Sequence, residues 1–195
     1  MIIKHLTKTS LLLGLFALIG CSLVALSFQF TFEQIKANER AKLLSTLNQF
    51  VSENEYDNDL FNDTRIINNE IVYRARKAKK PVAAIMTTVA PDGYNGRIRL
   101  LIAITYKGSL IGVRVLSHQE TPGLGDKIEL RRSNWILTFN QRSLTNPNPA
   151  AWKVKKDGGE FDQLTGATIT PRAIVKAVYK TLVFYQKNRE LVFAL

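Results

Sequence analysis

The sequence predicts an α+β protein, in which a single N-terminal transmembrane helix precedes a small antiparallel sheet with flanking helices. Three observations support this fold class. No charged residue stands between Thr9 and Phe32, and runs typical of β-strands, separated by turn residues, fill 70–120. Near the C-terminus, an apolar stripe with helical spacing follows Thr170 and Pro171.

The charge-free run is long enough to cross a membrane, because about 20 apolar residues span the hydrocarbon core of a bilayer. Lys4 and Lys8 precede the run, and this positive flank predicts a cytoplasmic N-terminus. Two alternatives are a cleaved signal peptide and a lipoprotein signal that ends at Cys21. Apolar residues continue past Cys21 and no small-residue cleavage site ends the run, so an uncleaved anchor is favoured.

We expect four segments along the chain. After the anchor, apolar residues between Phe32 and Phe50 recur at helical spacing and predict an amphipathic stalk, which a polar linker follows. The remainder has the size of a domain that builds its own core. The segments are a cytoplasmic N-terminus at 1–8, the transmembrane helix at 9–31, the stalk helix and linker at 32–63, and the folded domain at 64–195.

Composition excludes several kinds of site. The chain of 195 residues has one cysteine, Cys21, which excludes an intramolecular disulfide and Cys-based zinc or iron–sulfur centres. Its two histidines, His5 and His118, are far apart, so no metal site is expected. The formal net charge is +11, but the basic residues are dispersed and form no recognition helix, so no nucleic-acid partner is expected. A basic domain beside a membrane attracts anionic headgroups or an acidic redox partner instead.

The folded domain is expected to begin with an antiparallel meander, because turn residues separate its strand-like runs. Helical spacing of apolar residues predicts a helix over 125–139, and a Gly-Gly turn beside one or two short strands is expected in 151–167. Thr170 is the expected N-cap of the last helix, with Pro171 at its first position. The expected strands of the meander lie within 70–76, 81–90, 97–107 and 109–120.

The stretch HQETPGLGDKIE connects a predicted strand to a predicted helix. Its Pro122, Gly123 and Gly125 predict a sharply turned backbone that a ligand can approach closely. Glu120 and Thr121 place polar groups at the edge of this turn. The alternative is an ordinary strand-to-helix connection that uses glycine only for its turn.

The stretch DQLTGATITP leads into the last helix. Gly166 and Ala167 leave room beside Thr168 for an attacking or modified hydroxyl. The first N–H groups of the helix point back toward this loop, and a helix N-terminus binds phosphate through free N–H donors and its dipole. Arg172 and Lys176 add positive charge nearby. The alternative is that the threonines cap the helix and form only local hydrogen bonds.

The pattern Asp162-x-x-Thr165-Gly166-Ala167-Thr168 resembles the flavinylation motif of the FMN-binding domain family. In that family, a flavin transferase of the ApbE type joins FMN to the last threonine through a phosphoester. The segment ETPGLG is similar to a second segment of the same family. Both motifs, in this order behind one anchor, resemble the G subunit of the Rnf-type (Rsx) ion-translocating electron-transport complex. A related protein, the C subunit of the sodium-translocating NADH:quinone reductase, is typically longer than this chain.

The resemblance implies a covalent cofactor site without a catalytic side chain of its own. FMN is expected on Thr168, and the flavin transferase is expected to read Asp162, Gly166, Ala167 and Thr168. The 64–195 domain is then the FMN-binding domain. The other residues expected to contact the cofactor are Glu120, Thr121, Pro122, Gly123, Leu124, Thr165, Gly166 and Ala167.

The resemblance also implies a function. The chain is expected to be an electron-carrier subunit of a translocase, rather than a stand-alone enzyme, in the bacterial inner membrane with its domain on the periplasmic side. Its expected partners are the other membrane subunits and, during maturation, the flavin transferase. The anchor holds no ionisable residue, so ion conduction belongs to the partners. The alternatives are a membrane-anchored module that binds a phosphate-bearing ligand without redox chemistry, and an assembly subunit.

Overall fold

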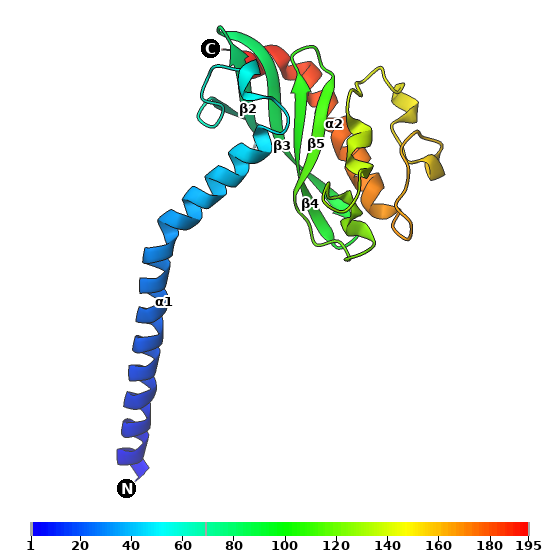
Figure 1. Ribbon diagram of the computed structural model, residues 1–195. Helices are drawn as coiled ribbons and strands as arrows, with labels where there is room; N and C mark the ends of the chain where they lie inside the picture. The colour runs from blue at the N-terminus through cyan, green and yellow to red at the C-terminus, as the bar shows by residue number, and fades with distance from the viewer. Residues whose placement is uncertain (1, 69, 195) are drawn as a thin grey trace. The chain divides into compact units, whose positions relative to one another are not determined.

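The computed structural model describes residues 2–68 and 70–194. The chain falls into two compact units, Met1–Ser45 and Thr46–Leu195 (Figure 1). Each unit is described by itself below.

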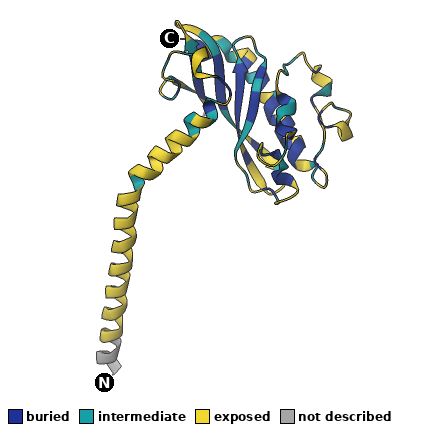
Figure 2. Cartoon of the chain, viewed as in Figure 1, coloured by how far each residue is buried: buried dark blue, intermediate teal, exposed yellow. Residues whose placement is uncertain are grey.

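Helix α1, Ile2–Leu47, runs through the first unit. By length and composition it holds one candidate membrane span, within Thr7–Leu47. Most of its large apolar side chains between Leu11 and Ile35 are exposed (yellow in Figure 2). A helix that exposes an apolar surface on all sides fits a membrane environment, and this agrees with the predicted anchor.

The second unit is built on a five-stranded antiparallel sheet in which each strand pairs with the next along the chain. The meander predicted from the sequence is therefore confirmed, and with it the α+β class. The first, short strand was not expected. The strands are β1 at Thr64–Ile67, β2 at Glu70–Lys77, β3 at Lys80–Gly93, β4 at Gly96–Thr105 and β5 at Leu110–Ser117.

One face of the sheet packs against the C-terminal helix α2, Ile169–Phe193, chiefly along β3. Alternate residues of β4, among them Leu100 and Ile102, are fully buried against it together with Ile174 and Val178 of the helix. Successive side chains of a strand point to opposite faces of the sheet, so every second residue of a strand can contribute to this core.

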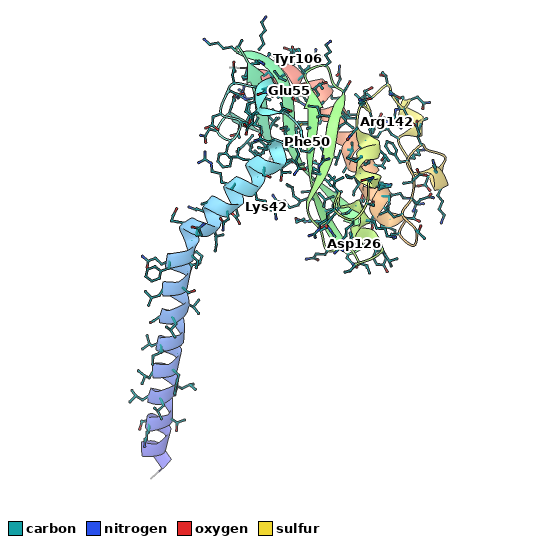
Figure 3. All side chains as sticks on the ribbon, in the orientation of Figure 1. Lys42, Phe50, Glu55, Tyr106, Asp126 and Arg142 are labelled. Atoms are coloured by element: carbon teal, nitrogen blue, oxygen red, sulfur yellow. The ribbon has the colours of Figure 1, made fainter. Side chains whose placement is uncertain are left out.

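The opposite face of the sheet is covered by the residues that follow α1 within the second unit. Phe50, labelled in Figure 3, lies so close to Gly112 of β5 that a Cβ there would be 3.2 Å from its ring. Arg114 stacks on the same ring, with 5.1 Å between its guanidinium and the ring centroid. Leu47 and Leu60 are buried on either side of Phe50 in the sequence. Part of the predicted stalk and linker thus packs on the sheet.

The prediction of one helix over 125–139 is wrong. Two short 3-10 helices stand there instead, η2 at Gly125–Ile128 and η3 at Trp135–Phe139. The Ser133 hydroxyl accepts from the Trp135 N–H and donates to the Lys127 carbonyl, which fixes a turn between them. The apolar spacing that suggested one helix reflects burial of Trp135, Ile136 and Phe139 in the core.

An aromatic cluster supports the irregular segment that follows η3. The rings of Phe139, Trp152 and Phe161 pack together, with 4.9 Å between the centroids of Phe139 and Phe161 and 5.0 Å between those of Trp152 and Phe161. The short strands expected in 151–167 are reduced to isolated bridges between Val154 and Phe161 and between Leu164 and Ala167. The remaining 3-10 helices are η1 at Glu53–Glu55, η4 at Pro149–Ala151 and η5 at Lys155–Asp157.

The start of α2 differs from the prediction. Thr168 is the N-cap, so Thr170 and Pro171 are the second and third residues of the helix, and the expected N-cap at Thr170 is wrong. Pro171 is tolerated there because first-turn N–H groups have no carbonyl partner within the helix. The Thr170 hydroxyl is instead used in a contact with another loop, described below.

The far end of α2 is held by basic side chains of the sheet. Arg65 and Arg74 both donate to the Ala194 carbonyl, at 2.6 and 3.0 Å, and Arg76 donates to that of Phe193, at 3.1 Å. These guanidinium groups satisfy carbonyls that a helix end leaves without partners. Asp63 forms ion pairs with both Arg74 and Arg76 and so fixes their positions.

Candidate flavin site

The two sequence motifs meet at the N-terminus of α2. A Cβ built on Gly166 would lie 3.0 Å from Cδ2 of Leu124, so the two loops are in contact. The Thr170 hydroxyl, in the first turn of α2, donates a short hydrogen bond to Oε2 of Glu120. The two motifs, which are far apart in the sequence, thus lie side by side in the fold.

The Glu120 carboxylate lies beneath the surface of this site and is 4% exposed. Its Oε1 atom accepts a hydrogen bond of 3.0 Å from the Asn95 N–H in the β3–β4 turn. The Asn95 side chain donates in turn to the Thr121 hydroxyl, at 3.2 Å. Glu120 therefore joins three segments through one carboxylate, and its place in the predicted site is that of a support below the surface.

Two glycines make room for this carboxylate. A Cβ on Gly125 would lie 2.9 Å from Cβ of Glu120 and 3.2 Å from the Thr170 hydroxyl. A Cβ on Gly93 would lie 2.9 Å from Oε1 of Glu120 and closer still to the Gly96 carbonyl. The backbone approaches the carboxylate from two sides at distances that only glycine permits.

The Thr121–Asp126 loop is held by its own hydrogen bonds. Gly123 has a φ of +80°, and its N–H donates to Oδ1 of Asp126 at 2.8 Å. The Thr121 carbonyl accepts from the Gly125 N–H at 3.0 Å. Asp126, labelled in Figure 3, is buried, whereas Leu124 at the outside of the loop is 43% exposed. The loop is a preformed turn that presents an apolar side chain.

His118 fixes the entry to this loop. Its Nδ1 atom accepts from the Glu120 N–H at 3.0 Å, which requires the ring proton to be on Nε2. Nε2 then donates to Oε1 of Glu129, also at 3.0 Å. The hydrogen bond from Arg131, with that from His118, holds the pKa of the Glu129 carboxyl below its ordinary value. Both ring nitrogens of His118 are thus engaged within the protein.

Thr168 stands at the end of the second loop, where α2 begins. It is half-buried, and its hydroxyl makes no capping hydrogen bond although it occupies the N-cap. The Leu164 carbonyl accepts from the Ala167 N–H at 2.9 Å, and this turn has Gly166 at a φ of +79° and leaves Thr165 exposed. Of the threonines in TGATIT, Thr168 combines the N-cap position with a hydroxyl that is not used in capping.

The charges near Thr168 are paired. Arg172 donates to Oδ1 of Asp157 at 2.6 Å, and Lys176 lies 2.6 Å from Oδ2 of Asp92. These hydrogen bonds lower the pKa of both carboxyl groups. The positive charge expected from Arg172 and Lys176 is therefore shared with carboxylates, and the N-terminus of α2 adds a partial positive charge of its own.

The predicted flavin-transferase recognition residue, Asp162, lies on the outer side of this region. Its side chain is 60% exposed and forms an ion pair of 2.6 Å with Lys155. Its carbonyl accepts from the Trp135 indole N–H at 2.7 Å, which fixes the start of the loop. The carboxylate is therefore accessible from solvent while its backbone is held by the core.

Sequence reasoning missed four supporting residues of the site: Gly93, Asn95, Asp126 and Thr170. Pro-Asp-Gly at 91–93 is a turn signal, but these residues end β3 and the turn follows at 94–95. Nothing in the sequence shows that this turn meets Glu120. Asp126 and Thr170 stand directly beside the predicted motifs, and a buried polar role for them depends on contacts across the fold. Among the described residues, no group of three or more His, Cys, Asp or Glu side chains is placed to hold a metal ion.

Comparison with known proteins identifies the family of this chain. The family described as "FMN-binding domain" matches residues 93–183, and the one described as "RnfG N-terminal region" matches residues 1–50. A protein of Shewanella loihica, named as the G subunit of an ion-translocating oxidoreductase complex, is 48% identical over 96% of this chain and 92% of its own. Proteins of the same name from Pseudoalteromonas atlantica and Vibrio cholerae are each 46% identical, over 97% and 94% of this chain and 92% and 91% of their own.

The fold and the site therefore define an FMN-binding domain behind an N-terminal apolar helix. The matched region runs from the β3–β4 turn into α2 and includes both loops of the site. Over nearly its whole length, the chain belongs to the family formed by the G subunits of ion-translocating oxidoreductase complexes.

Proposed function

We propose that this chain is the electron-carrier subunit of a membrane-bound ion-translocating oxidoreductase complex, and that it carries FMN through a phosphoester on Thr168. Family membership supports the complex and the cofactor. The observation that carries the covalent link is the position of Thr168: a half-buried hydroxyl, free of capping, at the start of a long helix and beside two small residues.

The residues around Thr168 fit a flavin nucleotide. Helix α2 has 25 residues, and the free N–H groups of its first turn, with the helix dipole, favour a phosphate at its N-terminus. Gly166 and Ala167 leave the hydroxyl oxygen approachable. Leu124 and Ile169, which are 43% and 45% exposed, offer apolar surface to a flat aromatic ring.

Thr168 acts as a tether in this proposal. Its oxygen forms a bond to the phosphorus of a flavin nucleotide while the bond from that phosphorus to a leaving group breaks. The proton of the threonine hydroxyl goes to the leaving group. When bound, FMN supplies the uptake and release of electrons. The chain's own residues hold and orient it: the loop with Leu124 forms one wall, and the helix start fixes the phosphate end. Asp162, with Gly166 and Ala167, is accessible to the flavin transferase that forms the bond.

We further propose that the domain lies on the periplasmic side of the bacterial inner membrane. The positive flank of Lys4 and Lys8 supports this orientation for a span at 9–31. No Asp, Glu, Lys, Arg or His stands between Thr9 and Phe32, which supports ion movement through other membrane subunits. The partners are then those subunits and, during maturation, the flavin transferase.

The test is the intact mass of the denatured protein after coexpression with a flavin transferase. We expect the wild-type chain to be heavier by one FMN less one water. Thr168→Val removes the hydroxyl at nearly constant volume, and its mass should be that of the unmodified chain. Thr165→Val tests the other exposed threonine of the same loop. If this variant still gains the mass of FMN, Thr165 does not hold the link.

Two results would contradict the proposal. An unmodified wild-type mass, while the transferase modifies a control substrate, contradicts the covalent link and leaves a non-redox binding or assembly subunit as the explanation. An added mass that survives Thr168→Val but is lost in Thr165→Val moves the link to the other threonine.

A further inference from the structure

A buried hydrogen bond joins Glu120 to Thr170, which stands two residues after the proposed tether, Thr168. Thr170 is 1% exposed and Glu120 is 4% exposed, so neither side chain presents a surface to a bound ring. Their hydrogen bond nevertheless joins the helix turn that follows Thr168 to the loop that carries Leu124. Any role of this pair in cofactor binding must therefore act through the segments that it joins.

The surroundings of the carboxylate show that the fold is shaped around it. Glu120 receives one donor on each oxygen, the Thr170 hydroxyl and the Asn95 N–H. Gly93 and Gly125 approach it so closely that a methyl group on either would lie 2.9 Å from a Glu120 atom. A buried carboxylate that loses one of two donors keeps the full cost of desolvation, so the segments around it must rearrange.

We propose that Thr170 and Glu120 are positioning residues for the flavin, an inference that rests on the proposed function. Their hydrogen bond fixes the start of α2, and with it Thr168, against the loop that carries Leu124. The phosphate end and one wall of the ring site are thereby held in one geometry. The pair sets the orientation of the ring, while attachment depends on the Thr168 hydroxyl.

The experiment uses the full chain, coexpressed with a flavin transferase and purified in detergent. Thr170→Val removes the hydroxyl and keeps the shape of the side chain. We expect it to keep the added mass of FMN, to lose most of the visible circular dichroism of the flavin, and to shift the flavin midpoint potential. Thr170→Ser keeps the donor and should restore both signals.

Thr181→Val is the matched control. Thr181 is another buried threonine of α2, 4% exposed, and its hydroxyl contacts the Ala177 carbonyl and Thr88, away from Glu120. It should leave dichroism and potential at wild-type values. If Thr170→Val does not fold, Glu120→Asp replaces it, because the shorter side chain keeps the charge but cannot reach both donors; the same losses are expected.

The outcomes separate the two proposals. Absence of flavin from the wild-type chain overturns the tether and, with it, the positioning role. Flavin on every variant, with dichroism and potential of the wild type in Thr170→Val or in its Glu120→Asp replacement, overturns the positioning role alone. Equal losses in Thr170→Val and Thr181→Val also overturn it, because they would reflect general loosening of α2.

Discussion

Gly125 shows at the level of one residue how closely the site is built around Glu120. Its backbone is buried, its N–H donates to the Thr121 carbonyl, and a Cβ on it would contact both Glu120 and Thr170 at 3.2 Å or less. The two glycines of ETPGLG are thus required for different physical reasons. Gly123 has a positive φ and open space around it, whereas Gly125 lies where a methyl group has no room.

Gly125→Ala is expected to lower the free energy of unfolding by about 1–3 kcal/mol, because the added methyl group overpacks a closed site. It should also reduce the visible circular dichroism of the flavin, because it displaces Glu120. Gly158→Ala is the control: Gly158 has a φ of +78° and nothing within 4 Å, so it strains the backbone without touching the site. Denaturant unfolding measures the stability of both variants, and visible circular dichroism measures the flavin signal in both. A Gly125→Ala chain with wild-type stability and dichroism contradicts this account.

For single residues, the sequence indicated which loops come together at the candidate site, but not the buried contacts beneath them. Gly166 and Leu124 were predicted to belong to one site, and the structure brings them into contact. The Thr170 contact was not predictable, because Thr-Pro matches the sequence pattern of a helix start, and the partner that binds its hydroxyl stands 50 residues earlier. Local patterns indicate caps, while long-range hydrogen bonds decide which threonine serves as one.

Helix α2 is the element on which the site depends, and it is fixed at both ends. Glu120 holds its first turn, and Arg65, Arg74 and Arg76 hold the carbonyls of its last. The Tyr185 hydroxyl donates to the Tyr106 carbonyl at 3.2 Å and joins the helix to the turn that follows β4. Because these contacts hold the helix in place, they also hold the residues of the site at its N-terminus.

Arg74→Gln is expected to lower the free energy of unfolding by about 2 kcal/mol, because it removes charge-assisted hydrogen bonds to the helix end and leaves Asp63 with one fewer partner. Amide hydrogen exchange should accelerate in the last turn of α2. Lys187→Gln removes one exposed positive charge from the same helix and should change stability by less than about 0.5 kcal/mol. Equal stability of the two variants contradicts the anchoring role.

The same scale shows where periodicity misleads. Four strands of the meander, β2 to β5, were predicted, because runs typical of strands with turn residues between them marked their positions. The segment 125–139 has helical spacing too, yet it forms η2 and η3 around a turn fixed by Ser133. Three buried residues at 135, 136 and 139 suffice for a helical pattern, and the pattern does not reveal how the backbone between them bends.

For the molecule as a whole, an apolar helix and a basic folded unit lie in one chain. Between Thr9 and Phe32 the helix carries no charge, and the net charge of the chain is +11. The compact unit begins at Thr46. Leu47, Phe50, Val51 and Leu60 at its start are buried within it. The polar residues between them, 52–59, predicted a linker, and the sequence did not indicate that the neighbouring apolar residues pack in the folded unit.

The proposed orientation predicts the behaviour of a C-terminal reporter. A phosphatase that is active only outside the cytoplasm should be active when fused to Leu195, and a reporter that requires the cytoplasm should be inactive. Replacing both Lys4 and Lys8 with Glu removes the positive flank and should yield a mixed orientation. A phosphatase that is silent while the cytoplasmic reporter is active places the domain on the other side.

The pairing of Thr170 with Glu120 exists only once the chain has folded. On a nascent polypeptide the three hydroxyls of TGATIT are equally open to solvent, and an enzyme that acts then must choose among them by reading the local sequence. On the finished domain Thr170 is closed off, whereas Thr165 and Thr168 remain within reach. The order of events during biosynthesis therefore decides whether the choice of hydroxyl is made by the modifying enzyme alone or partly by the acceptor itself.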